Sequence, residues 1–231
     1  MVMVSHDHEF IFLKTRKTAG TSVEMFLQPF CAPPGHPVVE QTHTLETHHG
    51  VIGMRLHPRP KDTAHPDMIW YNHMSAAAVH ENLGEEKWCR YRKITTIRDP
   101  FDSMISRFHY VRGWQGLPAL PNDLAVHREA FRDFVLNKSG PNDEDIVFEH
   151  GNFVPDILVR YEDLENDLKK LCEKLTLDAS LTRLPKTKVT AELRNGFSIS
   201  DYYDDETISA VVQKLRWYFE KGGYSRHPKP A

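Results

Sequence analysis

One short segment of the chain, KTRKTAGTS at residues 14–22, combines positive charges, hydroxyl groups and a glycine. It follows an apolar run and opens a stretch with helical spacing, so its backbone N–H groups would face outward at a helix N-terminus. Helix N-termini bind anions, to which Lys17 would add a point charge and Gly20 a close backbone approach. The hydroxyl donors are Thr18, Thr21 and Ser22. We expect an anion site; a basic turn with a hydroxyl cap is the alternative.

Histidine is unusually frequent, at 14 of the 231 residues. Because imidazole titrates near neutrality and is the commonest metal ligand, histidines are candidates for acid–base or metal chemistry. Several lie in a Pro- and Gly-rich stretch without a clear period: His43, His48, His49 and His57. No H-E-x-x-H or C-x-x-C spacing accompanies them, so we expect no metal site. They would then be solvated loop residues or the lining of a substrate pocket.

Apolar, β-branched segments that alternate with helical patterns must position these residues. Residues 9–14, 93–98 and 156–161 have the composition of buried strands. Helices are expected from Val23 and over residues 75–83, 99–113, 125–138, 164–175 and 204–221, with N-caps at Ser75, Asp99 and Asp204 or Asp205. This alternation predicts an α/β fold with a central parallel sheet and helices on both faces. We expect one domain over residues 1–231, with residues 31–67 as an irregular insert.

Composition and charge exclude several classes of protein. With 40% hydrophobic and 26% charged residues, the chain can build a core and is not globally disordered. A net charge of −3 argues against a protein that coats nucleic acid. No apolar run is long enough for a membrane span, and no secretory signal is visible. Three widely spaced cysteines favour a reducing compartment, so a cytoplasmic location is expected.

Four segments, taken in order, resemble one enzyme family. KTRKTAGTS resembles the 5′-phosphosulfate loop of sulfotransferases that use 3′-phosphoadenosine 5′-phosphosulfate (PAPS). ITTIRDPFDSMISRF, at 94–108, resembles their 3′-phosphate motif, a strand-end arginine followed eight residues later by a helix serine. LVRYEDL at 158–164 and GFSISDYYDDETISAVVQKLRWYFEKGGY at 196–224 resemble later elements of the carbohydrate branch. The resemblance implies a P-loop-like sheet. Arg16 departs from the family, which usually has proline there.

The resemblance implies a role for each matching residue. The 5′ end of PAPS would be held by Arg16, Lys17, Thr18, Ala19, Gly20, Thr21 and Ser22, and the 3′-phosphate by Arg98 and Ser106. Lys17 would stabilise the leaving oxygen, and no metal is required. An ion pair with Asp99 or Asp102 is the structural alternative for Arg98. A basic loop, residues 186–188, would close over the nucleotide.

The acceptor hydroxyl needs a general base, and the base expected from the resemblance is His73. It occupies the place of a histidine in the branch that resembles heparan 2-O-sulfotransferase, and a neutral imidazole can accept a proton near pH 7. A structural histidine is the bland alternative. Other candidates for the base are His80, Glu24 and Glu46.

The sequence therefore predicts a PAPS-dependent O-sulfotransferase that releases adenosine 3′,5′-bisphosphate and acts on a hydroxyl-bearing small molecule or a saccharide. Neither nucleic acid nor membrane is an expected partner. Two alternatives stay open. A small P-loop-type kinase would need the Walker A order, and here the lysine precedes the glycine. A nucleotide-binding module without turnover would bind the same ligand without transferring sulfate.

Overall fold

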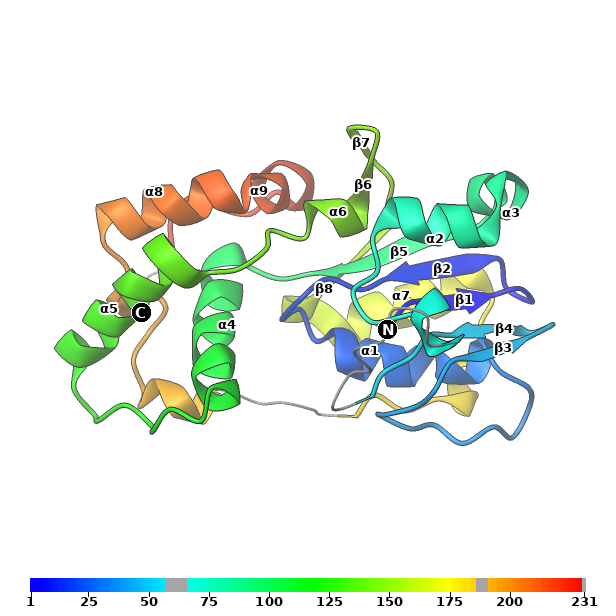
Figure 1. Cartoon of the computed structure of the whole chain (residues 1–231), viewed down its shortest axis with the longest axis horizontal. Helices are drawn as coiled ribbons and strands as arrows, with labels where there is room; N and C mark the ends of the chain where they lie inside the picture. Colours follow the sequence, from blue (N-terminus) through cyan, green and yellow to red (C-terminus); the bar gives the residue numbers. More distant parts are fainter. Residues whose placement is uncertain (57–65, 186–190, 230–231) are drawn as a thin grey trace. The chain divides into compact units, whose positions relative to one another are not determined.

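A six-stranded mixed sheet forms the centre of the first of two compact units in the computed structural model, which describes residues 1–56, 66–185 and 191–229 (Figure 1). The first unit comprises Met1–Ile97 and Asp143–Thr187, and the second comprises Arg98–Asn142 and Lys188–Ala231. The strand order is β3-β4-β1-β2-β5-β8. The strands are β1 (Met3–Ser5), β2 (Phe10–Leu13), β3 (Leu45–Thr47), β4 (Gly50–Ile52), β5 (Arg92–Ile97) and β8 (Ile157–Arg160).

The predicted α/β fold is confirmed, and the three predicted strands are parallel to one another, but the complete sheet is mixed. Strands β2, β5 and β8 are parallel to one another, whereas β1 is antiparallel to both β2 and β4, and β3 is antiparallel to β4. The reason is connection length. Only four residues separate β1 from β2, and a link that short can join only antiparallel strands.

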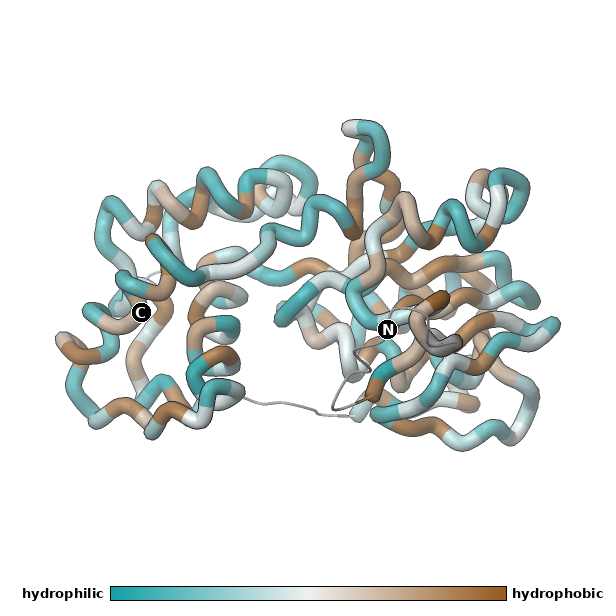
Figure 2. The backbone as a smooth tube through the Cα atoms, viewed as in Figure 1, coloured by the Kyte–Doolittle hydropathy of each residue, from teal (hydrophilic) through white to brown (hydrophobic). Residues whose placement is uncertain are grey.

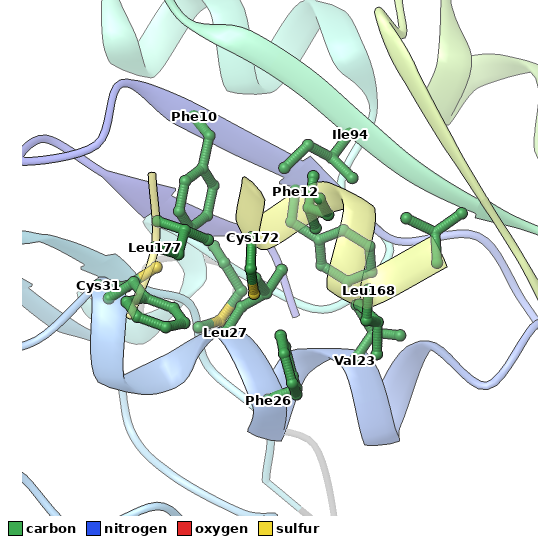
Figure 3. Close-up of a cluster of buried hydrophobic side chains, with 14 of the residues drawn as sticks. Phe10, Phe12, Val23, Phe26, Leu27, Cys31, Ile94, Leu168, Cys172 and Leu177 are labelled. Carbon is green, nitrogen blue, oxygen red and sulfur yellow. The ribbon is translucent and has the colours of Figure 1, made fainter. Parts of the chain in front are cut away.

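Helices cover both faces of this sheet (Figure 1). Helices α1 (Gly20–Leu27) and α7 (Leu164–Leu175) lie on one face, and α2 (Ala76–Leu83) and α3 (Glu85–Arg90) lie on the other. Alternate strand residues Phe10, Phe12 and Ile94 point into the core beneath α1 and α7, as the period of two along a strand requires (Figure 3). The short elements α6 (Glu144–Val147), β6 (Phe148–Glu149) and β7 (Asn152–Phe153) complete the unit.

The stretch expected to be an irregular insert contributes strands β3 and β4 to the sheet, so that part of the prediction is wrong. Both strands have three residues, too few to show a period. Gly50 is required where β4 meets β1, because a Cβ there would lie 2.1 Å from the Val4 carbonyl oxygen. Close backbone contact, rather than hydrophobic pattern, therefore fixes this edge of the sheet.

The second unit is helical and packs around aromatic side chains. Its elements are α4 (Pro100–Trp114), α5 (Leu124–Asp133), a π-helical turn (Phe134–Lys138), α8 (Asp205–Lys214) and α9 (Arg216–Gly222). Phe131 contacts Phe108, Tyr202 and Tyr203 edge-to-face, with ring centroids 4.9 to 5.5 Å apart. Teal and brown alternate along α8 in Figure 2, as expected for a helix with one face on a core.

The predicted helix caps are present. The Asp99 carboxylate accepts hydrogen bonds from the N–H groups of Phe101 and Asp102, at 3.0 and 3.3 Å, and Asp204 forms a capping box with Thr207. The last helix was expected to be continuous, but it is interrupted at Leu215 between α8 and α9. None of the helices in the described ranges is long and apolar enough to cross a membrane.

Candidate functional site

The loop between β2 and α1 contains two non-glycine residues in the left-handed region of backbone conformation. Lys17 and Ala19 both adopt positive φ, 64° and 62°, on either side of Thr18. Ala19 is the N-cap of α1, and the first helical hydrogen bond runs from Val23 N–H to Ala19 O at 3.2 Å. The amides ahead of Val23 therefore project from the positive end of the helix dipole. Alternating left- and right-handed residues of this kind form the concave nests that bind phosphate groups.

Buried threonines fix this loop to the neighbouring strand β5. Thr15 Oγ1 donates to Thr96 O at 2.5 Å and lies 2.9 Å from Thr18 Oγ1. Thr18 Oγ1 is also 2.6 Å from Thr96 Oγ1, and all three residues are fully buried. The Thr18 hydroxyl is thus turned into the fold, so Thr18 would reach an anion through its backbone only. Thr21 and Ser22 are likewise buried, within the first turn of α1.

A buried cluster of ion pairs packs against the loop. Lys14 Nζ lies 2.7 Å from Glu24 Oε2, and Arg55 donates to the same oxygen at 2.9 Å. Gly20 is needed here for a reason that the sequence does not show: its missing Cβ leaves space for the Lys14 stem, whose Cγ would lie only 2.8 Å from it. Glu24, an alternative for the base, is fully buried and neutralised by these cations.

Arg16, the residue that departs from the family pattern, is paired within its own unit. Its backbone N–H donates to Asp143 Oδ2 at 2.8 Å, and its guanidinium donates to Asp143 Oδ1. Asp143 is fully buried. This ion pair anchors the start of the loop and balances the charge of Arg16. Lys17, the next residue, is half-buried.

The structure brings His73 to this loop. His73 Nδ1 is 3.0 Å from the carbonyl oxygen of Lys14. Since a carbonyl only accepts, Nδ1 carries the proton, and in the neutral ring Nε2 is then an acceptor. No described residue is hydrogen-bonded to Nε2. Burial, followed by the positive charges of Lys14, the Met1 amino group and Arg16, holds the pKa of His73 well below its usual value.

The competing bases have other partners. His80 Nδ1 and Nε2 lie 2.8 Å from Glu149 and Glu85, and its ring stacks on Trp88. Burial opposes its charged form, but the two carboxylates outweigh burial and raise the pKa of His80. Glu46 Oε2 accepts a hydrogen bond from Trp70 Nε1 at 3.1 Å. Among the candidate bases, His73 is therefore the one placed at the loop.

Arg98 and Ser106 belong to the second unit. Arg98 directly follows β5, and its Nε lies 2.6 Å from Asp102 Oδ2, which is the ion pair considered as its structural alternative. Arg194 approaches the other oxygen of Asp102, also at 2.6 Å. Two guanidinium groups thus share one carboxylate, and the buried carboxylate of Asp99 lies near enough to interact with Asp102. Burial raises the pKa of Asp102, but the two arginines outweigh it and lower the pKa. Ser106 is buried on α4.

Arg194 is a residue that the sequence did not single out. It lies in a short 3-10 turn without hydrophobic period, and a basic residue before Asn195-Gly196 is its only visible signal. Its Nε is buried and has no hydrogen-bond partner within the described residues. The basic segment 186–188, expected to close over a nucleotide, lies outside the described residues.

The histidine-rich stretch shows no metal geometry. His48 and His49 have ring centroids 3.9 Å apart, and His49 Nδ1 is 2.6 Å from Asp7 Oδ2. His43 is exposed, and His57 lies outside the described residues. Across residues 1–56, 66–185 and 191–229, no group of three or more His, Cys, Asp or Glu side chains could hold a metal ion.

Comparison of the chain with protein-family models, with curated proteins and with solved structures finds no match in any of the three.

Proposed function

We propose that the chain is a PAPS-dependent O-sulfotransferase that transfers a sulfuryl group to an acceptor hydroxyl, with saccharides as the acceptor class. The observation that carries the proposal is the pairing of an anion-binding loop with a neutral imidazole. His73 donates from Nδ1 to Lys14 O at the start of the loop, which leaves Nε2 as a proton acceptor. A P-loop-like role for the strand–loop–helix unit of β2 and α1 is part of this proposal.

The loop suits the 5′ end of such a donor. The α1 amides and their dipole favour a doubly charged group. Lys17 is the cation that the resemblance assigns to the bridging oxygen. In the second unit, Arg98 with Ser106 is assigned to the 3′-phosphate. Arg98 and Arg194, which share Asp102, provide the guanidinium groups that would bind an anion there.

The chemical step requires one proton acceptor. His73 Nε2 would take the proton of the acceptor hydroxyl as its oxygen forms a bond to sulfur and the bond between sulfur and the bridging phosphate oxygen breaks. Lys17 would stabilise the negative charge that develops on that oxygen. Negative charge bound at the loop would also offset the cations that lower the pKa of His73 and raise it toward neutrality. The base would therefore strengthen when the donor is bound.

Nucleotide binding tests the donor assignment. Titration calorimetry should show that adenosine 3′,5′-bisphosphate binds more tightly than adenosine 5′-monophosphate. Arg98→Ala should reduce that difference by about 10- to 100-fold, because a charged hydrogen bond is lost. Arg92→Ala, at the exposed opposite end of β5, is the matched control and should retain the full difference in affinity between the two nucleotides. Preference for ATP over the bisphosphate would favour the kinase alternative and overturn the proposal.

Turnover tests the base. With radiolabelled PAPS and a panel of saccharides, His73→Ala should reduce the rate by about 10²- to 10⁴-fold and leave bisphosphate binding intact. His48→Ala, at an exposed histidine of the same unit, should have no effect. Lys17→Ala should reduce turnover more than affinity. Full activity of His73→Ala would refute the assignment of the base, and bisphosphate binding without transfer to any acceptor would favour the non-catalytic module.

The proton affinity of His73 provides an independent test. NMR titration of the histidine rings should show a low pKa for His73 in the free protein and a higher one with adenosine 3′,5′-bisphosphate bound. An unchanged pKa of His73 at saturating nucleotide would contradict the electrostatic coupling.

A further inference from the structure

The second unit contains a buried hydrogen-bonded network of two histidines and a tyrosine that the proposed reaction does not use. The Tyr202 hydroxyl lies 3.1 Å from His109 Nε2 and 3.0 Å from His127 Nδ1. All three side chains are at least nine-tenths buried. They come from α4, α5 and the turn before α8, so the network joins three segments that are distant in sequence.

The partners of this network fix every proton in it. His127 Nε2 lies 3.1 Å from the carbonyl oxygen of Pro121, which only accepts, so Nε2 carries the proton. The Asn195 amide nitrogen, 3.3 Å from Nε2, is a donor that bonds to the carbonyl oxygens of Leu120 and Pro121, so we assign the Nε2 proton from the shorter contact with Pro121. In neutral His127, Nδ1 must then accept from the Tyr202 hydroxyl.

The tautomer of His109 follows from its contact with Tyr202. Because the Tyr202 hydroxyl donates its proton to His127, its oxygen accepts from His109 Nε2–H, and His109 Nδ1 has a lone pair. Burial, followed by the charges of His127, Arg194 and Arg112, lowers the pKa of His109 to about 4, so the ring is neutral near pH 7. No described residue is hydrogen-bonded to Nδ1. His109 thus presents an unused acceptor on a ring that is almost wholly enclosed.

His109 lines an open cavity of about 150 Å³. Most of the other lining residues are apolar, among them Leu117, Leu120 and Leu193, and the polar ones are Arg112, Glu192 and Asn195. A cavity of roughly this volume can hold a benzene-sized molecule. The acceptor nitrogen calls for a donor group on the ligand. Because Arg112 and Glu192 line the cavity with opposite charges, the lining favours a neutral ligand.

We propose that this cavity binds a small neutral molecule with a compact apolar body and one hydroxyl group, which donates its hydrogen bond to His109 Nδ1. Phenol is the matching probe, and anisole is the control ligand, because it has a similar ring and oxygen but no donor. The proposal is independent of sulfuryl transfer, since it concerns binding in the absence of any nucleotide.

NMR titration of the whole chain tests the proposal. Phenol should shift the amide signals of cavity residues such as Gly113 and Leu117 saturably, and it should bind about two- to tenfold more tightly than anisole, as one hydrogen bond permits. His109→Phe should reduce that ratio to about one. His227→Phe, at an exposed histidine of the same unit, should preserve it.

Ring NMR of the unaltered protein keeps the test valid if His109→Phe does not fold. His109 should show the tautomer protonated at Nε2, and its Nδ1 signal should move with phenol and not with anisole. Equal affinity for the two ligands, binding remote from the cavity, or the opposite tautomer would each overturn the proposal.

Discussion

Replacement of Gly20 by alanine tests the packing on which the candidate loop depends. The added Cβ would lie 2.8 Å from Lys14 Cγ and 2.9 Å from Lys14 Cε, well inside van der Waals contact. A lysine on the surface would move aside at little cost. Here the lysine is buried, and its Nζ is held 2.7 Å from the fully buried carboxylate of Glu24, so it cannot move without weakening that ion pair.

The expected loss of stability follows from two opposing effects. Overpacking a well-filled site costs about 1–3 kcal/mol. Alanine in place of a helical glycine returns about 0.5–1 kcal/mol by reducing the freedom of the unfolded chain. The two ranges leave a net loss between about 0 and 2.5 kcal/mol. Because the ion pair with Glu24 keeps Lys14 from moving aside, we expect Gly20→Ala to lower the free energy of unfolding by about 1–2 kcal/mol. In a chain of this size, that corresponds to a fall in Tm of roughly 2–8 °C.

Urea unfolding followed by circular dichroism provides the assay. Gly113→Ala is the matched control, because Gly113 lies in α4 with nothing within 4 Å of its added Cβ and should gain about 0.5–1 kcal/mol. In a Lys14→Ala background the penalty of Gly20→Ala should largely disappear, and the double-mutant cycle measures that coupling. A Gly20→Ala protein as stable as the unaltered chain would refute the argument.

Four further outcomes follow from described contacts. Asp143→Asn should lower the unfolding free energy by about 1–3 kcal/mol in urea, since it weakens the buried partner of Arg16, and an unchanged value would contradict that role. The pKa of His109 is about 4 in the folded protein, so between pH 6.5 and 4 the unfolded chain binds a proton that the folded chain does not. The free energy of unfolding should therefore fall by up to about 3 kcal/mol over this pH range, and His109→Gln should reduce that fall. The pKa of His80 is raised in the folded protein, so its ion pairs stabilise the fold fully below pH 6.5 and lose this effect as the pH rises through the native pKa. The loss of stability caused by His80→Gln should therefore become smaller as the pH rises. A loss that does not change with pH would count against the ion pairs. Mass spectrometry after brief alkylation should find Cys89 modified, slowly because its pKa is raised by a neighbouring glutamate, and modification of the buried cysteines first would contradict the packing.

The parts of the fold with a local signal were predictable. Strands β2, β5 and β8 have apolar, β-branched runs, and the caps Ser75, Asp99 and Asp204 marked helix starts correctly. Strands β1, β3 and β4 have three residues each, which is too few for a period of two to appear. The break at Leu215 also has no signal, because the sequence around it remains helical in pattern.

The candidate site was also predictable only in part. The strand–loop–helix order of the sequence predicted where the backbone of the loop lies. The positions of its side chains depend on tertiary contacts, which no local sequence pattern shows. The hydroxyl of Thr18 was expected to face a ligand and instead bonds to Thr96, 78 residues away. Gly20 was expected to admit a ligand and instead admits Lys14. Arg194 approaches Asp102 across 92 residues.

The three buried threonines have a kinetic consequence. Thr15 and Thr18 are bonded to Thr96 on β5, so the turn between β2 and α1 is held in shape by the sheet itself. An anion arriving at the α1 amides would not have to order the turn first, and little conformational entropy would be lost on binding. The initial association of an anion with the α1 amides should therefore follow diffusion and charge, with ionic strength as its main control, and should show no slow phase from ordering of this turn.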